Sequence, residues 1–133
     1  MGSCQCGVDP HPVFYTAYLY YNNAKGDDLL DPKTAGYFNI DTIKVNGLNN
    51  VNGNFNISYM QPGNIGNMPE GYSLSIILKG NSEIITLNKA TVDTLYHSFS
   101  GKTLVSCKYN NITISPPIGK NSFTTNFPIV VTK

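Results

Sequence analysis

The sequence has 133 residues, a formal charge of +1 and only 13% charged residues, which indicates one small, nearly neutral domain. It contains 17 Asn and no Arg, so turn-forming residues are abundant and helix-forming residues are scarce. Without Arg or a basic run, the chain lacks the charge that nucleic acid or an anionic membrane surface would require. Its longest apolar stretch, residues 13–21, is far shorter than the roughly 20 residues of a membrane-spanning helix.

The first residues predict an attachment to a membrane. Gly2, Ser3 and Cys4 match the end of a bacterial lipoprotein signal, in which small residues precede the Cys that becomes lipidated. Residues 1–12 would then form a tether, and residues 13–133 a single domain. A cloning remnant is the alternative for residues 1–3, but it does not explain Cys4. We therefore expect a lipid anchor at Cys4 and, through it, a membrane as partner.

The other two cysteines allow two interpretations. Lipidation of Cys4 would leave Cys6 free to pair with Cys107 in an oxidising compartment. The favoured alternative is that Cys107 is a reduced core residue, because it alternates with Val105 and Tyr109 on one face of a strand. A Cys-X-Cys pair without a nearby His is a poor zinc signature, so we expect no metal and no cofactor.

Short alternating runs, separated by clusters of Asn, Gly and Pro, predict a series of strands. We expect a turn at Asn46 and Gly47, a hairpin turn at Gly80 and Asn81, a second hairpin turn at Asn110 and Asn111, and a long exposed loop over residues 61–71. The predicted strands are residues 13–21, 37–45, 54–59, 72–79, 83–87, 91–99, 103–109, 112–115 and 127–132.

The spacing of these runs, 8 to 12 residues, predicts an all-β fold with a single antiparallel β-sandwich. A barrel is the alternative. No alternation of strands and helices is present, which disfavours a parallel sheet and its phosphate-binding loops.

Three segments carry a resemblance to a known group of proteins. They are NAKGDDLLDP at residues 23–32, NKATVDTL at residues 88–95, and KYNN at residues 108–111. In this order, and after an aromatic first strand, they resemble small Bacteroidetes-type secreted lipoproteins of unknown function. The resemblance implies an immunoglobulin-like β-sandwich on a lipid anchor, exported to the cell envelope and held at the outer membrane. It implies no catalytic activity.

The acidic and histidine residues give weak signals for chemistry. Asp27, Asp28 and Asp31 lack the spacing of an EF-hand loop, so we interpret them as turn-capping residues rather than calcium ligands. His11 lies between two prolines of the predicted tether. His97 shares a strand face with apolar residues, where a hydrogen-bonded core histidine is the usual role.

No nucleophile or carboxylate pair stands out either. Ser106 and Cys107 lie in the middle of a strand, without the sharp turn or helix terminus that activates a nucleophile. Glu70 and Glu83 are the only glutamates, and nothing in the sequence brings them to the separation of a glycosidase pair. We therefore expect a protein that is not an enzyme.

A binding role is the stronger hypothesis, with a glycan or a protein as ligand. Tyr59 and Tyr72 flank the loop over residues 61–71, which also contains Asn64 and Asn67. Tyrosine rings and loop amides are suited to stacking and hydrogen bonding with a ligand. These four residues are the candidate ligand contacts, and a carbohydrate-binding module of a glycan-uptake system is one specific alternative. The tyrosines of the first strand are expected to be mostly core residues.

A third hypothesis is a structural or adhesion subunit that acts by strand pairing. The segment over residues 127–132 is apolar and would form the last strand, which another chain could accept at a sheet edge. An ordinary final strand in its own sheet is the preferred interpretation.

Overall fold

The computed structural model describes residues 14–50, 55–61, 68–101, 103–115 and 124–133. The predicted tether, including Cys4, Cys6 and His11, therefore lies outside the described residues. In chain order, the elements are β2 (Phe14–Asn22), the 3-10 turn η1 (Ile40–Thr42), β3 (Lys44–Val45), β4 (Asn56–Met60), β5 (Gly71–Ile77), β6 (Ser82–Asn88), β7 (Thr91–Ser100), β8 (Thr103–Tyr109), β9 (Ile112–Ile114) and β10 (Thr124–Thr132).

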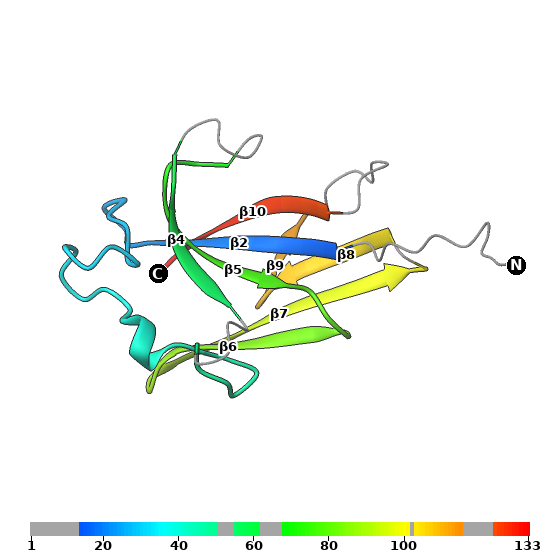
Figure 1. Cartoon of the computed structure of the whole chain (residues 1–133), viewed down its shortest axis with the longest axis horizontal. Helices are drawn as coiled ribbons and strands as arrows, with labels where there is room; N and C mark the ends of the chain where they lie inside the picture. Colours follow the sequence, from blue (N-terminus) through cyan, green and yellow to red (C-terminus); the bar gives the residue numbers. More distant parts are fainter. Residues whose placement is uncertain (1–13, 51–54, 62–67, 102, 116–123) are drawn as a thin grey trace, which may run out of the picture.

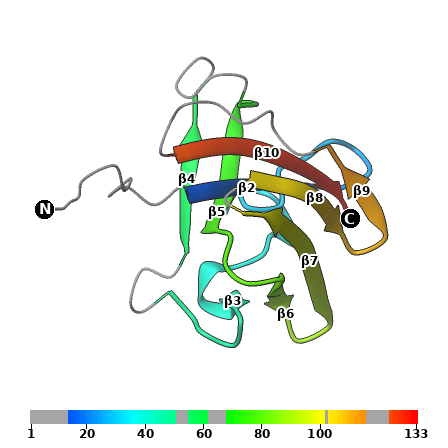
Figure 2. The ribbon, with the colours of Figure 1, turned by 90° about the vertical axis from the view of Figure 1, so that its right-hand side faces the viewer.

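The strands form two sheets that pack against each other (Figures 1 and 2). One sheet has the order β10-β2-β5-β4, and the other has the order β3-β6-β7-β8-β9. Strand neighbours are antiparallel throughout, except for β2 and β10. The structure thus confirms the predicted all-β, antiparallel β-sandwich.

The parallel pairing of β2 and β10 is an arrangement that the sequence did not predict. The register runs from Thr124 opposite Phe14 to Thr132 opposite Asn22, so the two strands pair over their full length. Within β10, Ile129 is buried and Val130 is exposed, which shows that one face of this strand packs on the core. The segment is thus a strand of its own sheet, as preferred from the sequence.

The core lies between the sheets and follows from the alternation along each strand. In β6, for example, Ile85 and Leu87 are buried, whereas Ile84, which precedes them, is exposed. The first strand is buried on both sides at its end, since Tyr21 faces the core and Tyr20 packs against Met60 and Met68 on the opposite face. The largest fully buried core residues are Tyr21, Tyr109, Leu19, Ile43, Leu74, Ile76, Ile85, Leu87, Leu95 and Ile129.

The strand predicted over residues 37–45 is wrong for most of its length. Only residues 44 and 45 pair as a strand, and η1 precedes them. The reason is local, because the Asn39 side chain accepts a hydrogen bond from the backbone N–H of Asp41 at 2.9 Å and begins a turn instead. The predicted turn after this segment is confirmed, with φ of +55° at Asn46 and +80° at Gly47.

The hairpin predicted for residues 72–79 with 83–87 is also wrong. Both strands exist, but β5 pairs with β2 and β4, whereas β6 pairs with β3 and β7 in the other sheet. The chain crosses between the sheets at this point. Its crossing is fixed by the buried Glu83 carboxylate, which accepts a hydrogen bond from the backbone N–H of Lys79 at 2.9 Å.

The alternation predicted along β8 is wrong at Val105, because a β-bulge interrupts the strand there. Ser106 lies opposite Ser98, but the next pair joins Leu104 to Phe99, so Val105 is an extra residue. Val105 is therefore exposed and does not share a face with Cys107. Cys107 is a free, buried thiol, as favoured from the sequence, and burial raises its pKa to about 11.

Candidate binding site

Two of the predicted ligand contacts lie side by side at the surface. Tyr59 of β4 and Tyr72 of β5 are opposite each other in the strand register, and their rings meet edge to face with centroids 5.2 Å apart. Tyr59 is 45% exposed. Its hydroxyl donates a hydrogen bond to the Glu70 carboxylate, and this bond raises the pKa of Tyr59. The ring therefore keeps its proton and a defined orientation while one face remains open to solvent.

A groove of about 230 Å³ begins at Tyr72. It lies between the edge of β4 and the segment that leads from β2 to η1. We call this groove the aromatic groove. It is formed mainly by Pro32, Tyr37, Phe38, Ile40, Ile57 and Tyr72. Tyr59 continues the aromatic surface beyond Tyr72, so the site presents rings that a ligand can contact from outside.

Asp28 holds the two walls of the aromatic groove together. One carboxylate oxygen accepts the backbone N–H of Tyr72 at 2.8 Å, and the other accepts the backbone N–H of Leu30 at 2.9 Å. Gly71 makes this approach possible, because it has φ of +134° and a Cβ atom there would lie 3.2 Å from the Asp28 carboxylate. The acidic residue thus positions Tyr72 through its main chain.

The interpretation of the aspartates as turn-capping residues is confirmed for Asp28 and Asp31, whereas the turn at Asp27 is capped by the Asn23 side chain, which accepts the backbone N–H groups of Lys25 and Asp27. Asp31 accepts the backbone N–H of Lys33 at 2.9 Å, as Asp28 does for Leu30. Asp27 accepts a hydrogen bond from the Asn23 side chain at 3.1 Å. These carboxylates therefore stabilise the loop that carries one wall of the groove.

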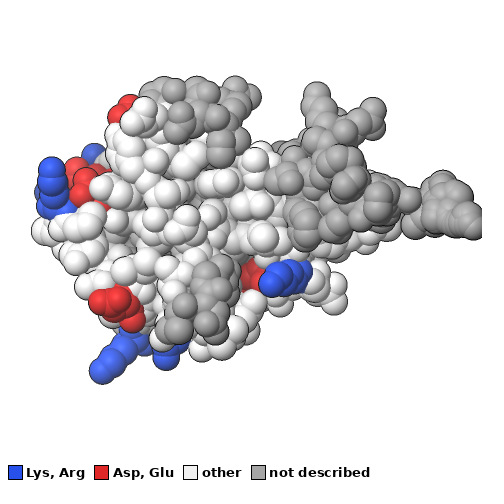
Figure 3. Space-filling model, in the orientation of Figure 1, with Lys and Arg blue, Asp and Glu red and all other residues white. Residues whose placement is uncertain are grey.

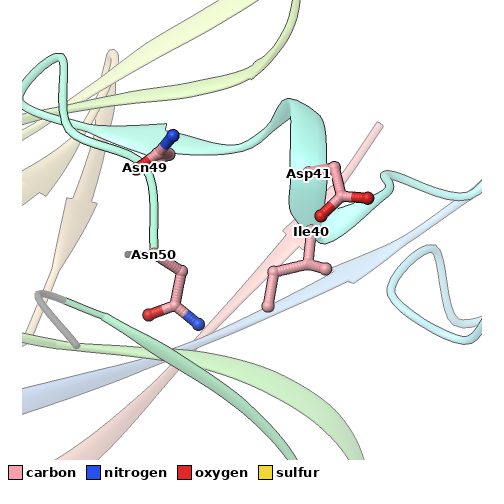
Figure 4. A pocket seen from close by; sticks show the side chains of 4 residues that line it. All are labelled: Ile40, Asp41, Asn49 and Asn50. Atoms are coloured by element: carbon pink, nitrogen blue, oxygen red, sulfur yellow. The ribbon is translucent and has the colours of Figure 1, made fainter. Parts of the chain in front are cut away.

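A second, more polar pocket of about 210 Å³ adjoins η1 (Figure 4). It is formed by Ile40, Asp41, Asn49 and Asn50, and we call it the amide pocket. Figure 4 shows Ile40 and Asp41 on η1, and Asn49 and Asn50 on the segment that follows β3. Both elements come from the Asn-rich region that the sequence analysis treated only as a strand and a turn.

In the face shown in Figure 3, charged side chains gather mainly at the left-hand end, and a further acidic and basic group lies in the lower middle of the view, near the end of β5. Strands β2, β4 and β5 place Thr16, Ser58, Ser73 and Ser75 on the side of the sheet away from the core. These hydroxyl groups lie on the face of the sheet opposite to Tyr59 and Tyr72, whereas Glu70 and Asp28 place carboxylates beside the two tyrosines.

Glu83 and His97 form a buried pair that the sequence analysis did not connect. His97 Nε2 lies 2.9 Å from Glu83 Oε2, and the two residues are 3% and 2% exposed. The other Glu83 oxygen accepts the Asn46 side-chain amide at 2.8 Å. Burial favours the neutral acid, but the hydrogen bonds from His97, Lys79 and Asn46 outweigh this effect and lower the pKa of Glu83. The predicted role of His97 as a hydrogen-bonded core residue is confirmed.

Asp93 is the centre of a second buried network, which joins the two sheets. Tyr109 donates a hydrogen bond to Asp93 at 2.6 Å, and the Lys133 ammonium lies 2.5 Å from the same oxygen. Because Tyr109 donates its only proton to Asp93, the Tyr21 hydroxyl at 2.7 Å must donate to Tyr109. Burial favours protonated Asp93, but hydrogen bonds from Lys133, Tyr109 and Asn110 outweigh it and lower the pKa of Asp93.

The structure brings together only part of the predicted site. Tyr59 and Tyr72 are in contact, and Tyr72 lines the aromatic groove. Asn64 and Asn67 lie outside the described residues, as does Cys4. Tyr37, Asp41, Asn49 and Asn50 were missed, because Tyr37 and Asp41 lie within the second predicted strand and Asn49 and Asn50 lie in the Asn-rich stretch after it.

Comparison of the chain with protein-family models, with curated proteins and with solved structures found no match. In the described part of the chain, no helix has the length and apolar character needed to cross a membrane.

The buried Glu83 predicts a fall in stability at acidic pH. Its pKa is lowered by folding, so the unfolded chain binds more protons, and the free energy of unfolding decreases as the pH falls below about 4.5. Glu83→Gln should flatten this dependence, with Asp93 supplying the slope that remains. Urea unfolding at a series of pH values measures the effect. The control is Asp41→Asn, which removes an exposed carboxylate; an unchanged slope in Glu83→Gln would contradict the assignment.

Proposed function

We propose that the chain is the non-catalytic domain of an exported cell-envelope lipoprotein, and that it binds a neutral carbohydrate. The observation that carries the proposal is the Tyr59–Tyr72 pair at the mouth of the aromatic groove. Exposed tyrosine rings offer an apolar face to a sugar ring and a hydroxyl for its polar edge. A groove with aromatic walls and a few polar groups at its rim is typical of small-ligand sites.

The charge of the site favours a neutral ligand. Neither the aromatic groove nor the amide pocket has a Lys among its described lining residues, whereas Asp41 and Glu70 supply carboxylates nearby. A phosphate or a uronic acid would meet like charge and find no cation to pair with. Sugar hydroxyl groups, in contrast, both donate to carboxylates and exchange hydrogen bonds with amides.

A non-catalytic role is supported by what the acidic residues already do. Glu83 and His97 resemble an acid–base pair in chemistry, but they are buried and hydrogen-bonded to the fold. Asp28 is engaged by two backbone N–H groups. These carboxylates stabilise the fold through hydrogen bonds to other residues of the protein.

The proposed membrane attachment depends on Cys4 and the tether over residues 1–12. An anchor there would hold the domain at the envelope without a spanning helix. The gene sequence ahead of the Cys4 codon tests this attachment. We expect it to encode an apolar stretch preceded by Lys upstream of Gly2, and a natural reading frame that starts at Met1 would contradict the anchor.

A glycan array tests the ligand class. We expect the protein to bind neutral glycans, and we expect Tyr59→Ala to reduce that binding at least tenfold because the open ring is lost. Tyr96→Ala is the matched control, since Tyr96 is a similarly exposed tyrosine in β7, away from the groove. Absence of binding by the natural protein, or an equal loss in both variants, would overturn the proposal.

A further inference from the structure

The aromatic groove and the amide pocket share a wall. Ile40 lines both, and it lies in η1 between Asn39, on the groove side, and Asp41, on the pocket side. The two hollows therefore lie on either side of one short turn. A ligand that fills the aromatic groove needs only to pass Ile40 to reach the amide pocket.

The shared wall is held in place by hydrogen bonds within the protein. The Asn39 side chain accepts the backbone N–H of Asp41 at 2.9 Å, and the Thr42 hydroxyl donates to the Leu87 carbonyl of β6 at 2.9 Å. These bonds fix η1 against the core sheet. The position of Asp41 relative to Ile40 is thus set by the fold before a ligand arrives.

The two hollows differ in chemistry. The aromatic groove offers the Tyr72 and Tyr37 rings, whereas the amide pocket offers one carboxylate and two carboxamides. In the described part of the chain, the Asp41, Asn49 and Asn50 side chains make no hydrogen bond to another residue, so their polar groups are available. One hollow is suited to the face of a sugar ring, and the other to its hydroxyl groups.

Size indicates how the hollows are used. Each has a volume of 210–230 Å³, below the roughly 300 Å³ at which pockets for drug-sized ligands begin. Either hollow alone accommodates little more than one ring. A ligand that uses all of these groups must therefore extend across both.

Building on the carbohydrate-binding function above, we propose that the ligand is a neutral oligosaccharide of at least two units. One unit stacks in the aromatic groove beside Tyr72. The next unit is hydrogen-bonded in the amide pocket by Asp41, Asn49 and Asn50. The amide pocket is then the subsite that selects for chain length and against anionic sugars.

Calorimetric titration with one neutral sugar series, as monosaccharide, disaccharide and trisaccharide, tests this arrangement. We expect the disaccharide to bind at least tenfold more tightly than the monosaccharide. Asn50→Ala should abolish this gain, because it removes a hydrogen-bonding side chain of the second subsite; the readout is the ratio of disaccharide to monosaccharide affinity within each variant. Asn111→Ala, an exposed amide in the β8–β9 hairpin, is the matched control and should retain the full gain.

The outcomes separate this inference from the function on which it rests. A gain that persists in Asn50→Ala, or a disaccharide no tighter than the monosaccharide, overturns the second subsite alone. A natural protein that binds no member of the series, or whose binding survives Tyr59→Ala, overturns the carbohydrate-binding function itself. Urea unfolding of Asn50→Ala confirms that the variant is folded, and Asn50→Gln provides a second variant that keeps the amide but displaces it.

Discussion

Asp93→Ala is expected to lower the free energy of unfolding by about 3 kcal/mol at pH 7, because it removes one partner of a buried, hydrogen-bonded ion pair. The Asp93 carboxylate accepts hydrogen bonds from Tyr109 and Asn110 and pairs with the Lys133 ammonium. Tyr109 is in turn hydrogen-bonded to Tyr21 in the other sheet. Its loss leaves these donors without their acceptor in a poorly solvated site. Urea unfolding followed by tyrosine fluorescence measures the change.

Two variants define the origin of this effect. Asp93→Asn keeps an acceptor for Tyr109 but removes the charge that faces Lys133, so we expect an intermediate loss. Asp27→Ala removes an exposed carboxylate of the same type and should change the free energy of unfolding by no more than about 0.5 kcal/mol. If Asp93→Ala fell within that same range, the network would not be a stabilising link between the sheets.

Asp28→Ala is expected to lower both stability and ligand affinity. The backbone N–H groups of Tyr72 and Leu30 lose their acceptor, which should cost about 2 kcal/mol of unfolding free energy. Because Tyr72 is held through this bond, we also expect neutral oligosaccharides to bind at least fivefold more weakly. The carboxylate itself contacts no ligand in this proposal, so Asp28 acts as a positioning residue.

Asp31→Ala is the matched control, because Asp31 caps the same loop through Lys33 without contacting β5. It should retain full affinity. Asp28→Asn provides rescue, since its amide oxygen can still accept one of the two N–H groups, and we expect partial recovery of both properties. An Asp28→Ala variant with normal affinity would show that Tyr72 is held in place by packing alone.

The sequence predicted local features better than partners between distant segments. Turns at Asn46 and Asn110 were found because a positive φ is a property of one or two residues. The pairing of β5 and β6 was predicted wrongly, since alternation identifies a strand but not its neighbour. The crossing between sheets depends on the buried Glu83 contact to Lys79, which no local pattern reveals.

Only some of the residues of the candidate site were predicted from the sequence, for the same reason. Tyr59 and Tyr72 were singled out because both flank one loop, and they do meet. The other half comes from residues 37–50, where a predicted strand concealed the turn at η1 and the role of Asn49 and Asn50. The amide pocket exists only because η1 and the segment after β3 meet in space.

The parallel pairing of β2 with β10 has a consequence for how the domain acquires its structure. β2 gains this neighbour only after about 110 further residues have been synthesised, because Asn22 pairs opposite Thr132. Contacts of such high sequence separation slow folding, and β-sandwiches of this size typically fold in milliseconds to seconds. The sheet that carries Tyr72 therefore stays open at one edge during synthesis and closes only when the final strand arrives.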